Sequence, residues 1–384
     1  MKKHILIAIA LLLCIKIYSQ NSSKNIDFSA VHQHFVVMDV LLSGNEPTEN
    51  QWNNLFQTAA YKELIRREFK SPTRFQEVFR AAYLPGHTKD VNEILKRIDR
   101  KGNFWTAWVT TLLEAYENIP NQKEELIQLI EDYQKLELSE FAKEQSARFL
   151  PENHFEDFPK IAFVIFNDSR GYDPIILSLN SYVKTGDLRD NQALDCMTEL
   201  GHDKDFSFQL LYAHEAFHYY RAKKKEFNFP DNNDPYSSLI WIMNQIENEG
   251  IADQIDKQIQ YFEPGCFADT REGERYLGYL DLHPGLILKM DSMFVEIANH
   301  QDSAKIFSKR FSRMIPRAGH QTGFYMCNAI INEFGEASLK SISRNPYAFF
   351  KLYQKAAIKN NELLAFSEKS LDFISFLEKR YLIN

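Results

Sequence analysis

The chain has 384 residues, of which 44% are hydrophobic and 14% aromatic, so it can bury a large core. This composition is not typical of a disordered or fibrous protein. The formal net charge is −7, and acidic and basic residues are interspersed along the chain. Because no basic stripe is present that would neutralise phosphates, we expect no nucleic-acid partner.

The first twenty residues have the pattern of a secretory signal peptide. Lys2 and Lys3 precede an apolar run at 5–13, and Ser19 and Gln20 follow near the end. This run is shorter than the roughly 20 apolar residues that a membrane-spanning helix needs, and no later segment approaches that length. We therefore predict an exported protein, periplasmic or secreted, with no transmembrane segment once the signal is removed. An uncleaved anchor is the alternative.

The cysteines contribute little to the predicted fold. Cys14 lies within the predicted signal peptide, but two leucines stand where lipoprotein signals place small residues, so we do not expect a lipoprotein. After the signal, Cys196, Cys266 and Cys327 remain, and an oxidising compartment could pair two of them and must leave one over. The absence of a CxxC motif or Cys/His cluster excludes a finger-type zinc site.

The N-terminal part of the chain reads as a series of helices. Ser71 and Pro72 are typical of an N-cap followed by the first helical position, and apolar residues then recur at helical spacing. Further helical patterns span 88–98, 102–117, 123–134 and 138–149. We expect a helical region over residues 21–158.

Two runs rich in branched and aromatic residues predict strands after this region. They are IAFVIF at 161–166 and IILSLNSYV from Ile175, with turn-forming residues between them. In the second run, Ser178 and Asn180 alternate with apolar residues, so one face of that strand is expected to be partly polar. After Asp205 the pattern is again mainly helical. The predicted fold class is therefore α+β, mainly α-helical, with a small sheet in a second region at 159–384.

The segment LLYAHEAFHY, from Leu210 to Tyr219, contains an H-E-x-x-H motif formed by His214, Glu215 and His218. On a helix, residues four apart share a face, so both imidazoles can bind one tetrahedral metal ion. Glu215 would then flank the ion where a bound water is deprotonated. The motif also occurs in proteins that bind no metal, so a helix that carries two histidines by chance is the alternative.

The segment NQIENEGIADQID offers two candidates for a third ligand, Glu247 and Glu249. Two residues apart on a helix, they point in nearly opposite directions, so only one can face the histidines. Asp253 lies four residues after Glu249 on the same face, where it could accept the outer N–H of a ligating histidine. We therefore prefer Glu249 with Asp253. A solvated acidic helix face is the alternative.

The sequences HEAFH at 214–218 and NEGIAD at 248–253 resemble the motifs of gluzincins, the group of zinc peptidases that includes thermolysin. The second segment matches the pattern N-E-x-x-S-D, with Ala252 where serine is usual. The resemblance implies a zincin-like core, Glu249 as the third Zn²⁺ ligand and Asp253 as the residue that orients a histidine. The rest of the chain is more similar to a family of exported bacterial proteins described as putative zinc-dependent peptidases, with HExxH, E-G-x-A-D and G-H-x-x-G-x-Y-M blocks.

The last of these blocks, GHQTGFYM at 319–326, supplies candidates for a donor to the oxyanion that forms during hydrolysis. The candidates are His320 and Tyr325, and the resemblance slightly favours Tyr325. A helix-start cap or surface histidine is the alternative for His320, and a core aromatic residue for Tyr325. His283 precedes a proline and has no partner at ligand spacing, so we expect it to be structural.

These observations predict a zinc-dependent peptidase that acts on a peptide or protein substrate, with Glu215 as general base. The alternative is an exported binding or structural protein whose motif is accidental or decayed. Zinc peptidases of similar design pair an edge strand with the extended substrate. We therefore expect residues 175–182 to form an edge strand with a free backbone, one open face and a position close to His214.

Overall fold

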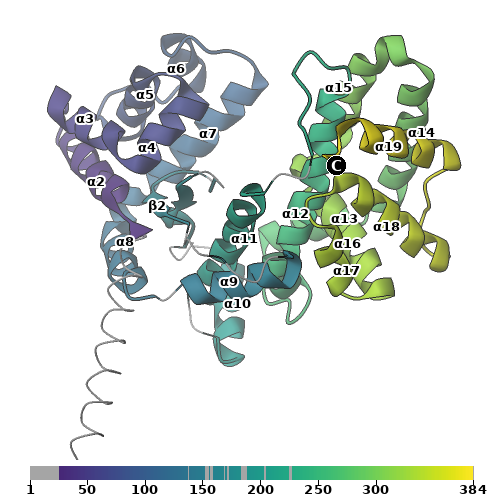
Figure 1. The fold of residues 1–384 in the computed structure, drawn as a ribbon. Helices are drawn as coiled ribbons and strands as arrows, with labels where there is room; N and C mark the ends of the chain where they lie inside the picture. Colours follow the sequence, from purple (N-terminus) through teal and green to yellow (C-terminus); the bar gives the residue numbers. More distant parts are fainter. Residues whose placement is uncertain are drawn as a thin grey trace, which may run out of the picture. The chain divides into compact units, whose positions relative to one another are not determined.

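A computed structural model of the chain describes residues 26–383, apart from 137, 152–154, 156–158, 168, 171–172, 183–187, 203–204 and 225–226. The predicted signal peptide lies outside the described residues. The chain is mainly helical, as Figure 1 shows. It also contains a small three-stranded parallel sheet. It forms two compact units, Met1–Ser139 with Asp157–Lys184, and Glu140–Glu156 with Thr185–Asn384.

The first unit holds the sheet and the helices that pack around it. The helices are α2 (Ser29–Leu42), α3 (Glu49–Gln57), α4 (Ala59–Leu64), α5 (Pro72–Tyr83), α6 (Val91–Arg97), α7 (Asn103–Glu117) and α8 (Ile119–Tyr133), with a π-helical turn at Ile65–Phe69. Within this unit the helices predicted from periodicity are confirmed, with ends shifted by a few residues. Helix α5 begins at Pro72 as predicted, and its apolar residues Phe75, Val78 and Phe79 are fully buried.

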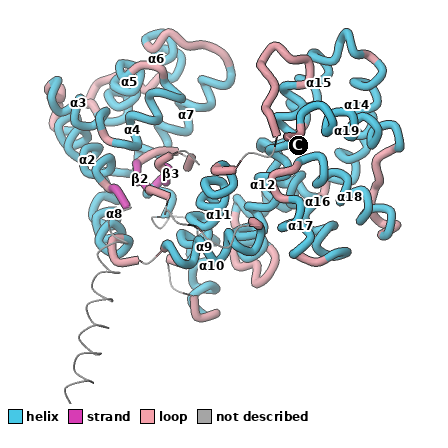
Figure 2. Tube along the Cα trace, in the orientation of Figure 1, coloured by secondary structure: helices cyan, strands magenta, loops and turns pink. Residues whose placement is uncertain are grey.

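The sheet has the strand order β1-β2-β3 and is parallel throughout. Its strands are β1 (Ile26–Asp27), β2 (Ile161–Val164) and β3 (Ile175–Ser178). Figure 2 shows β2 and β3 side by side. Every residue of these two strands is buried, because helices of the first unit cover the sheet.

The prediction of a strand over 175–182 with one open face is wrong. The strand ends at Ser178, and a 3-10 helix follows over Leu179–Tyr182. The hydroxyl of Ser178 donates to the carbonyl of Phe166 at 2.5 Å, and Asn180 Oδ1 accepts the Phe166 amide at 3.0 Å. These polar side chains therefore bond to buried backbone groups instead of facing water.

The outer edge of β3 is only partly free. Although β3 is the last strand in the order, Ile176 exchanges two backbone hydrogen bonds with Arg170, at 2.7 and 2.9 Å. The predicted peptide-binding edge with a free backbone is thus contradicted at its centre. The strand belongs to the first unit and His214 to the second, so the expected position of the strand close to His214 stays a prediction.

The second unit is entirely helical among its described elements. The helices are α9 (Ser139–Phe149), α10 (Leu188–Glu199), α11 (Phe206–Ala222), α12 (Ser237–Tyr261), α13 (Arg271–Leu280), α14 (His283–Asn299), α15 (Ala304–Met314), α16 (His320–Phe334), α17 (Ala337–Ile342), α18 (Pro346–Lys359) and α19 (Glu368–Tyr381), with 3-10 turns at Gln301–Ser303 and Pro316–Gly319. Helix α12 is its centre, since α11, α13, α15, α16 and α18 all pack against it. The division into regions 21–158 and 159–384 stays a prediction, and the compact units, unlike those regions, are discontinuous in sequence.

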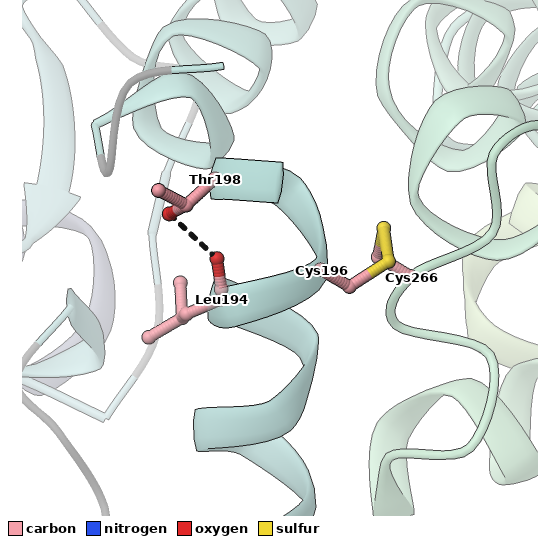
Figure 3. Close-up of a disulfide and its surroundings, with 4 residues drawn as sticks. All are labelled: Leu194, Cys196, Thr198 and Cys266. Carbon is pink, nitrogen blue, oxygen red and sulfur yellow. Dashed lines mark hydrogen bonds between the residues drawn. A yellow bond between two sulfur atoms is a disulfide. The ribbon is translucent and has the colours of Figure 1, made fainter. Parts of the chain in front are cut away.

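One disulfide joins Cys196 of α10 to Cys266 in the turn after α12, as Figure 3 shows, whereas Cys327 is free and buried. The bond closes a loop with a sequence separation of 70, which contains α11 and α12. In the chain-entropy account, a loop of this length stabilises the fold by roughly 4 kcal/mol. None of the described helices combines the length and the apolar content of a membrane-spanning segment.

Candidate metal centre

The H-E-x-x-H motif lies on helix α11, which is held in place by buried apolar residues. Its apolar residues Leu210 and Phe217 are fully buried, and the helix packs against α12. His214 and Glu215 are 3% and 9% exposed. The side chain of His218 is 13% exposed. The three motif residues therefore lie at the boundary between core and solvent, where a ligand can be held partly away from water.

Two glycines set the distance between α12 and α16. A Cβ added at Gly250 would lie 2.3 Å from the backbone of Gly323, and one added at Gly323 would lie 1.9 Å from the carbonyl oxygen of Ile246. No side chain other than hydrogen fits at either position. This close crossing explains why glycine stands in both the E-G-x-A-D and the G-H-x-x-G blocks, and it brings the neighbouring Glu249 and His320 together.

Three side-chain atoms converge at the centre. His218 Nε2 lies 3.1 Å from His214 Nε2 and 3.0 Å from Glu249 Oε2, and His214 Nε2 lies 3.7 Å from the same oxygen. These residues form a group able to hold a metal ion. Ligand atoms about 2.0 to 2.1 Å from a tetrahedral zinc lie roughly 3.3 Å apart, and the three observed separations bracket that value.

The remaining nitrogen of His214 is held by Asp256. Its Nδ1 lies 3.1 Å from Asp256 Oδ1, and the fully buried carboxylate also binds the ammonium of Lys257 at 2.7 Å. Since a carboxylate only accepts, His214 donates from Nδ1 and turns the lone pair of Nε2 toward the other two atoms. A zinc ligand needs this tautomer. With its two nitrogens and one carboxylate oxygen, the donor set fits Zn²⁺.

Asp256 is not among the predicted site residues, although helical phase could have identified it. At about 100° per residue, positions 253 and 256 lie within about 40° of Glu249 on the same face of α12. The carboxylate that contacts His214 most closely is Asp256, since Asp253 Oδ1 lies farther away at 3.6 Å.

Asp253 instead pairs with His320. Its Oδ1 and Oδ2 lie 3.0 and 3.2 Å from His320 Nδ1, and the Tyr276 hydroxyl donates to Oδ2 at 2.8 Å. His320 Nε2 then lies 3.5 Å from Glu249 Oε2. His214, Asp253 and His320 form a second group with metal-ligand geometry, which shares His214 with the first. The imidazole of His320 is 30% exposed and is the most accessible side chain of the centre.

Glu247 points away from this centre. It is fully buried, accepts the backbone N–H of Arg344 at 2.9 Å and forms an ion pair with Arg221. Arg344 in turn donates to the backbone carbonyl of Arg221 near the end of α11. The structure thus brings Glu249, and not Glu247, to the two histidines, and Glu247 ties α11 to α12 from the other side.

Tyr325 and His283 lie together on another face of α16. Their rings are stacked with centroids 5.5 Å apart, and the described contacts of Tyr325 are with His283 and Tyr353. His283 lies 3.1 Å from both the Leu280 carbonyl and the Thr322 hydroxyl, which agrees with a structural role. Five residues after His320, Tyr325 is rotated by about 140° around the helix axis. His320 therefore borders the group of ligand atoms, whereas Tyr325 lies on another face of α16.

The electrostatics of the centre favour positive charge. Burial alone lowers the pKa of His214, but the carboxylates of Asp256, Glu249 and Asp253 outweigh it and hold the pKa well above its usual value. For Glu249 burial raises the pKa, and the imidazoles of His218 and His320 outweigh that effect and hold it well below normal. Buried carboxylates that surround imidazole nitrogens are the environment that a bound cation requires.

The pKa of Glu215 is shifted in the opposite direction from that of Glu249. Its burial raises the pKa of the carboxyl group, although the imidazoles of His218 and His214 act against this. A carboxylate with a raised pKa accepts a proton more readily, which is the property of a general base.

Residues 52–362 match the model of a family described as "Putative zinc dependent peptidase (DUF5700)". The match covers most of the chain and includes every residue of the candidate centre. No curated protein and no solved structure matches the chain.

Proposed function

Since the chain belongs to the putative zinc-dependent peptidase family, we propose that it hydrolyses peptide bonds at a single Zn²⁺ held by His214, His218 and Glu249. The observation that carries the proposal is the convergence of two imidazole nitrogens and one carboxylate oxygen at separations of 3.0 to 3.7 Å. The two helices that supply them, α11 and α12, would form the centre of a zincin-like core.

The residues of this chain have distinct roles in the proposed reaction. A zinc ion held here would act as a Lewis acid that polarises the peptide carbonyl and makes a water molecule nucleophilic. Glu215 accepts a proton from the attacking water and passes it to the leaving amine. In the form protonated on both ring nitrogens, His320 donates from Nε2 to the oxyanion that develops on the former carbonyl oxygen. Asp256 keeps His214 in the tautomer that binds metal.

The substrate class follows from the family, and we propose a peptide or protein substrate. We also propose that the protein is exported. The disulfide between Cys196 and Cys266 supports this, because such bonds persist in oxidising compartments.

The replacement Glu215→Gln tests the proposed reaction. Glutamine keeps the shape of the side chain but cannot accept a proton, so kcat should fall at least about 100-fold while zinc stays bound. The assay measures cleavage of a quenched fluorescent peptide library and zinc per chain for both proteins. Full activity in Glu215→Gln would contradict the mechanism. A wild-type protein that binds zinc and cleaves no peptide would favour a non-catalytic binding protein.

A further inference from the structure

Tyr276 of α13 contacts the candidate centre through its hydroxyl group. Its ring is 2% exposed and packs against Tyr261 and Phe324, with centroids 5.0 and 5.8 Å away. Its hydroxyl donates to Oδ2 of Asp253 at 2.8 Å. The packed ring therefore fixes the position of a hydrogen-bond donor beneath a fully buried carboxylate.

The carboxylate of Asp253 relays this constraint to His320. With Oδ2 held by Tyr276, Oδ1 is the closer acceptor for His320 Nδ1, at 3.0 Å. Because a carboxylate accepts and does not donate, His320 carries a proton on Nδ1, and its Nε2 faces the carboxylate of Glu249 at 3.5 Å. The ring of His320 lies nearly parallel to that of His214, with an interplanar angle of 19°.

The turn before His320 packs closely against α12, since a Cβ added at Gly319 would lie 2.9 Å from the backbone of Ile246, and it also has a contact with α13. Arg317 and Ala318 have φ values of 42° and 52°, and Gly319 follows with φ of 102°. Left-handed conformations at residues other than glycine cost of order 1 kcal/mol and persist only where surrounding contacts enforce them. Here Arg317 forms an ion pair with Glu272 of α13. Helix α13 thus contacts both the turn that carries His320 and the carboxylate that orients its ring.

We propose that α13 is the positioning element of the centre and that Tyr276 is a positioning residue for His320. Tyr276 fixes Asp253, and Asp253 fixes the ring of His320 so that Nε2 points to the place where the substrate oxyanion develops. The inference rests on the proposed function in one respect, the action of His320 on substrate. The orientation of the ring itself does not depend on that function.

The replacement Tyr276→Phe removes the hydroxyl and leaves the packed ring. Its matched control is Tyr261→Phe, which removes a hydroxyl from the neighbouring ring, for which the structure shows no hydrogen bond to Asp253. Three quantities are measured in the full chain: zinc per chain, kcat and KM on a quenched fluorescent peptide, and the Nδ1–H signal of His320 in protein labelled with ¹⁵N-histidine. The signal is assigned by its loss in His320→Gln.

We expect Tyr276→Phe to keep one zinc per chain and a KM within about twofold of wild type, because no ligand is touched. Its kcat should fall about 10-fold, since a misaligned oxyanion donor loses much of its effect. The Nδ1–H signal of His320 should broaden by exchange with water. Tyr261→Phe should match the wild type in all three measurements.

A sharp Nδ1–H signal in Tyr276→Phe, or a kcat equal to that of wild type, would overturn the inference. Loss of zinc in His320→Gln would also overturn it, because His320 would then be a ligand. A wild-type protein that cleaves no peptide contradicts the proposed function, and the Nδ1–H signal alone then decides whether Tyr276 holds the ring.

Discussion

Each unit contains a buried histidine cluster, and the two clusters differ in the chemistry of their partners. In the first unit, His34 lies 2.7 Å from the Tyr61 hydroxyl through Nδ1 and 2.8 Å from the Tyr83 hydroxyl through Nε2. Tyr61 donates its own proton to the Ile165 carbonyl, so it accepts from His34 Nδ1–H, and Tyr83 donates to Nε2. Both nitrogens of a neutral imidazole are thereby satisfied.

The cluster around His214 is built from charged partners. One nitrogen of His214 contacts the carboxylate of Asp256, and the other faces His218 and Glu249. Burial lowers the pKa of His34 to about 3, whereas the carboxylates hold that of His214 well above its usual value. A buried histidine with two hydroxyl partners is structural. A buried histidine whose second nitrogen lies beside other potential ligand atoms is suited to bind a metal.

A substitution that forces α12 away from α16 should disrupt the cluster around His214 and leave the cluster around His34 intact. In Gly250→Ala the new methyl carbon meets the Gly323 backbone at 2.3 Å, so the helices must separate. We expect zinc to be lost and the second unit to be destabilised by about 1 to 3 kcal/mol or more. Zinc per chain and thermal unfolding measure the two effects.

The matched control is Gly278→Ala on α13, where an added Cβ meets nothing within 4 Å. The same substitution there should keep zinc and stabilise the protein by about 0.5 to 1 kcal/mol, since alanine favours helix. If Gly250→Ala binds zinc as tightly as Gly278→Ala, the close crossing is not what positions Glu249.

Removing the negative charge of Asp256 would make the cluster around His214 more like the cluster around His34, whose partners are neutral hydroxyl groups. Asp256→Asn keeps the size of the side chain but withdraws the carboxylate that fixes the Nδ1 tautomer. Zinc affinity should fall about 10- to 100-fold, as expected for loss of a hydrogen-bond partner of a ligating histidine. Competition with a fluorescent chelator measures this affinity, and an unchanged value would assign the orientation of His214 to other contacts.

The cluster around His34 should make the stability of the protein depend on pH in the acid range. Its pKa of about 3 in the folded state lies below the usual value of 6.5, so between these values the unfolded chain binds more protons. Stability is therefore present above pH 6.5 and is lost as pH falls toward 3. At pH 5 the loss should be about 2 kcal/mol relative to pH 7.

The variant His34→Gln, which does not titrate, isolates this contribution. Glutamine should lower stability at pH 7 because it cannot reproduce the geometry of both hydrogen bonds. The further loss between pH 7 and pH 5 should be smaller than in wild type by about 2 kcal/mol. Chemical unfolding at both pH values measures the difference, and equal losses in the two proteins would show that His34 is not the group responsible.

The predictable parts of the molecule were those set by helical phase. Periodicity located the helices of the first unit and the site helix. The opposite directions of Glu247 and Glu249 indicate that only one of them can face the histidines, and Asp253 on the face of Glu249 decides between them. The structure places Glu249 beside the histidines. Phase also places Asp253 on the correct face. It could not show that Asp253 pairs with His320, 67 residues away, because that contact depends on the crossing of α12 and α16.

The alternation of polar and apolar residues gave a wrong prediction where polar side chains form hydrogen bonds with the backbone. Ser178 and Asn180 alternate with apolar residues as they would on a half-exposed strand, yet both bond to the backbone of Phe166. The partner of such a side chain is set by tertiary packing, which the sequence pattern does not contain. The resemblance slightly favours Tyr325 over His320 as oxyanion donor, and Tyr325 lies against His283 on another face of α16, so its role stays a prediction.

The central claim is that Glu249 completes a zinc site with His214 and His218. Metal analysis of the purified full chain tests it most directly when Glu249→Ala is compared with Glu247→Gln. We predict about one zinc per chain in wild type and in Glu247→Gln, although the latter should be less stable because Arg221 loses its ion pair with a carboxylate. Glu249→Ala should contain almost none. Zinc retained by folded Glu249→Ala, or lost only from Glu247→Gln, would contradict the account.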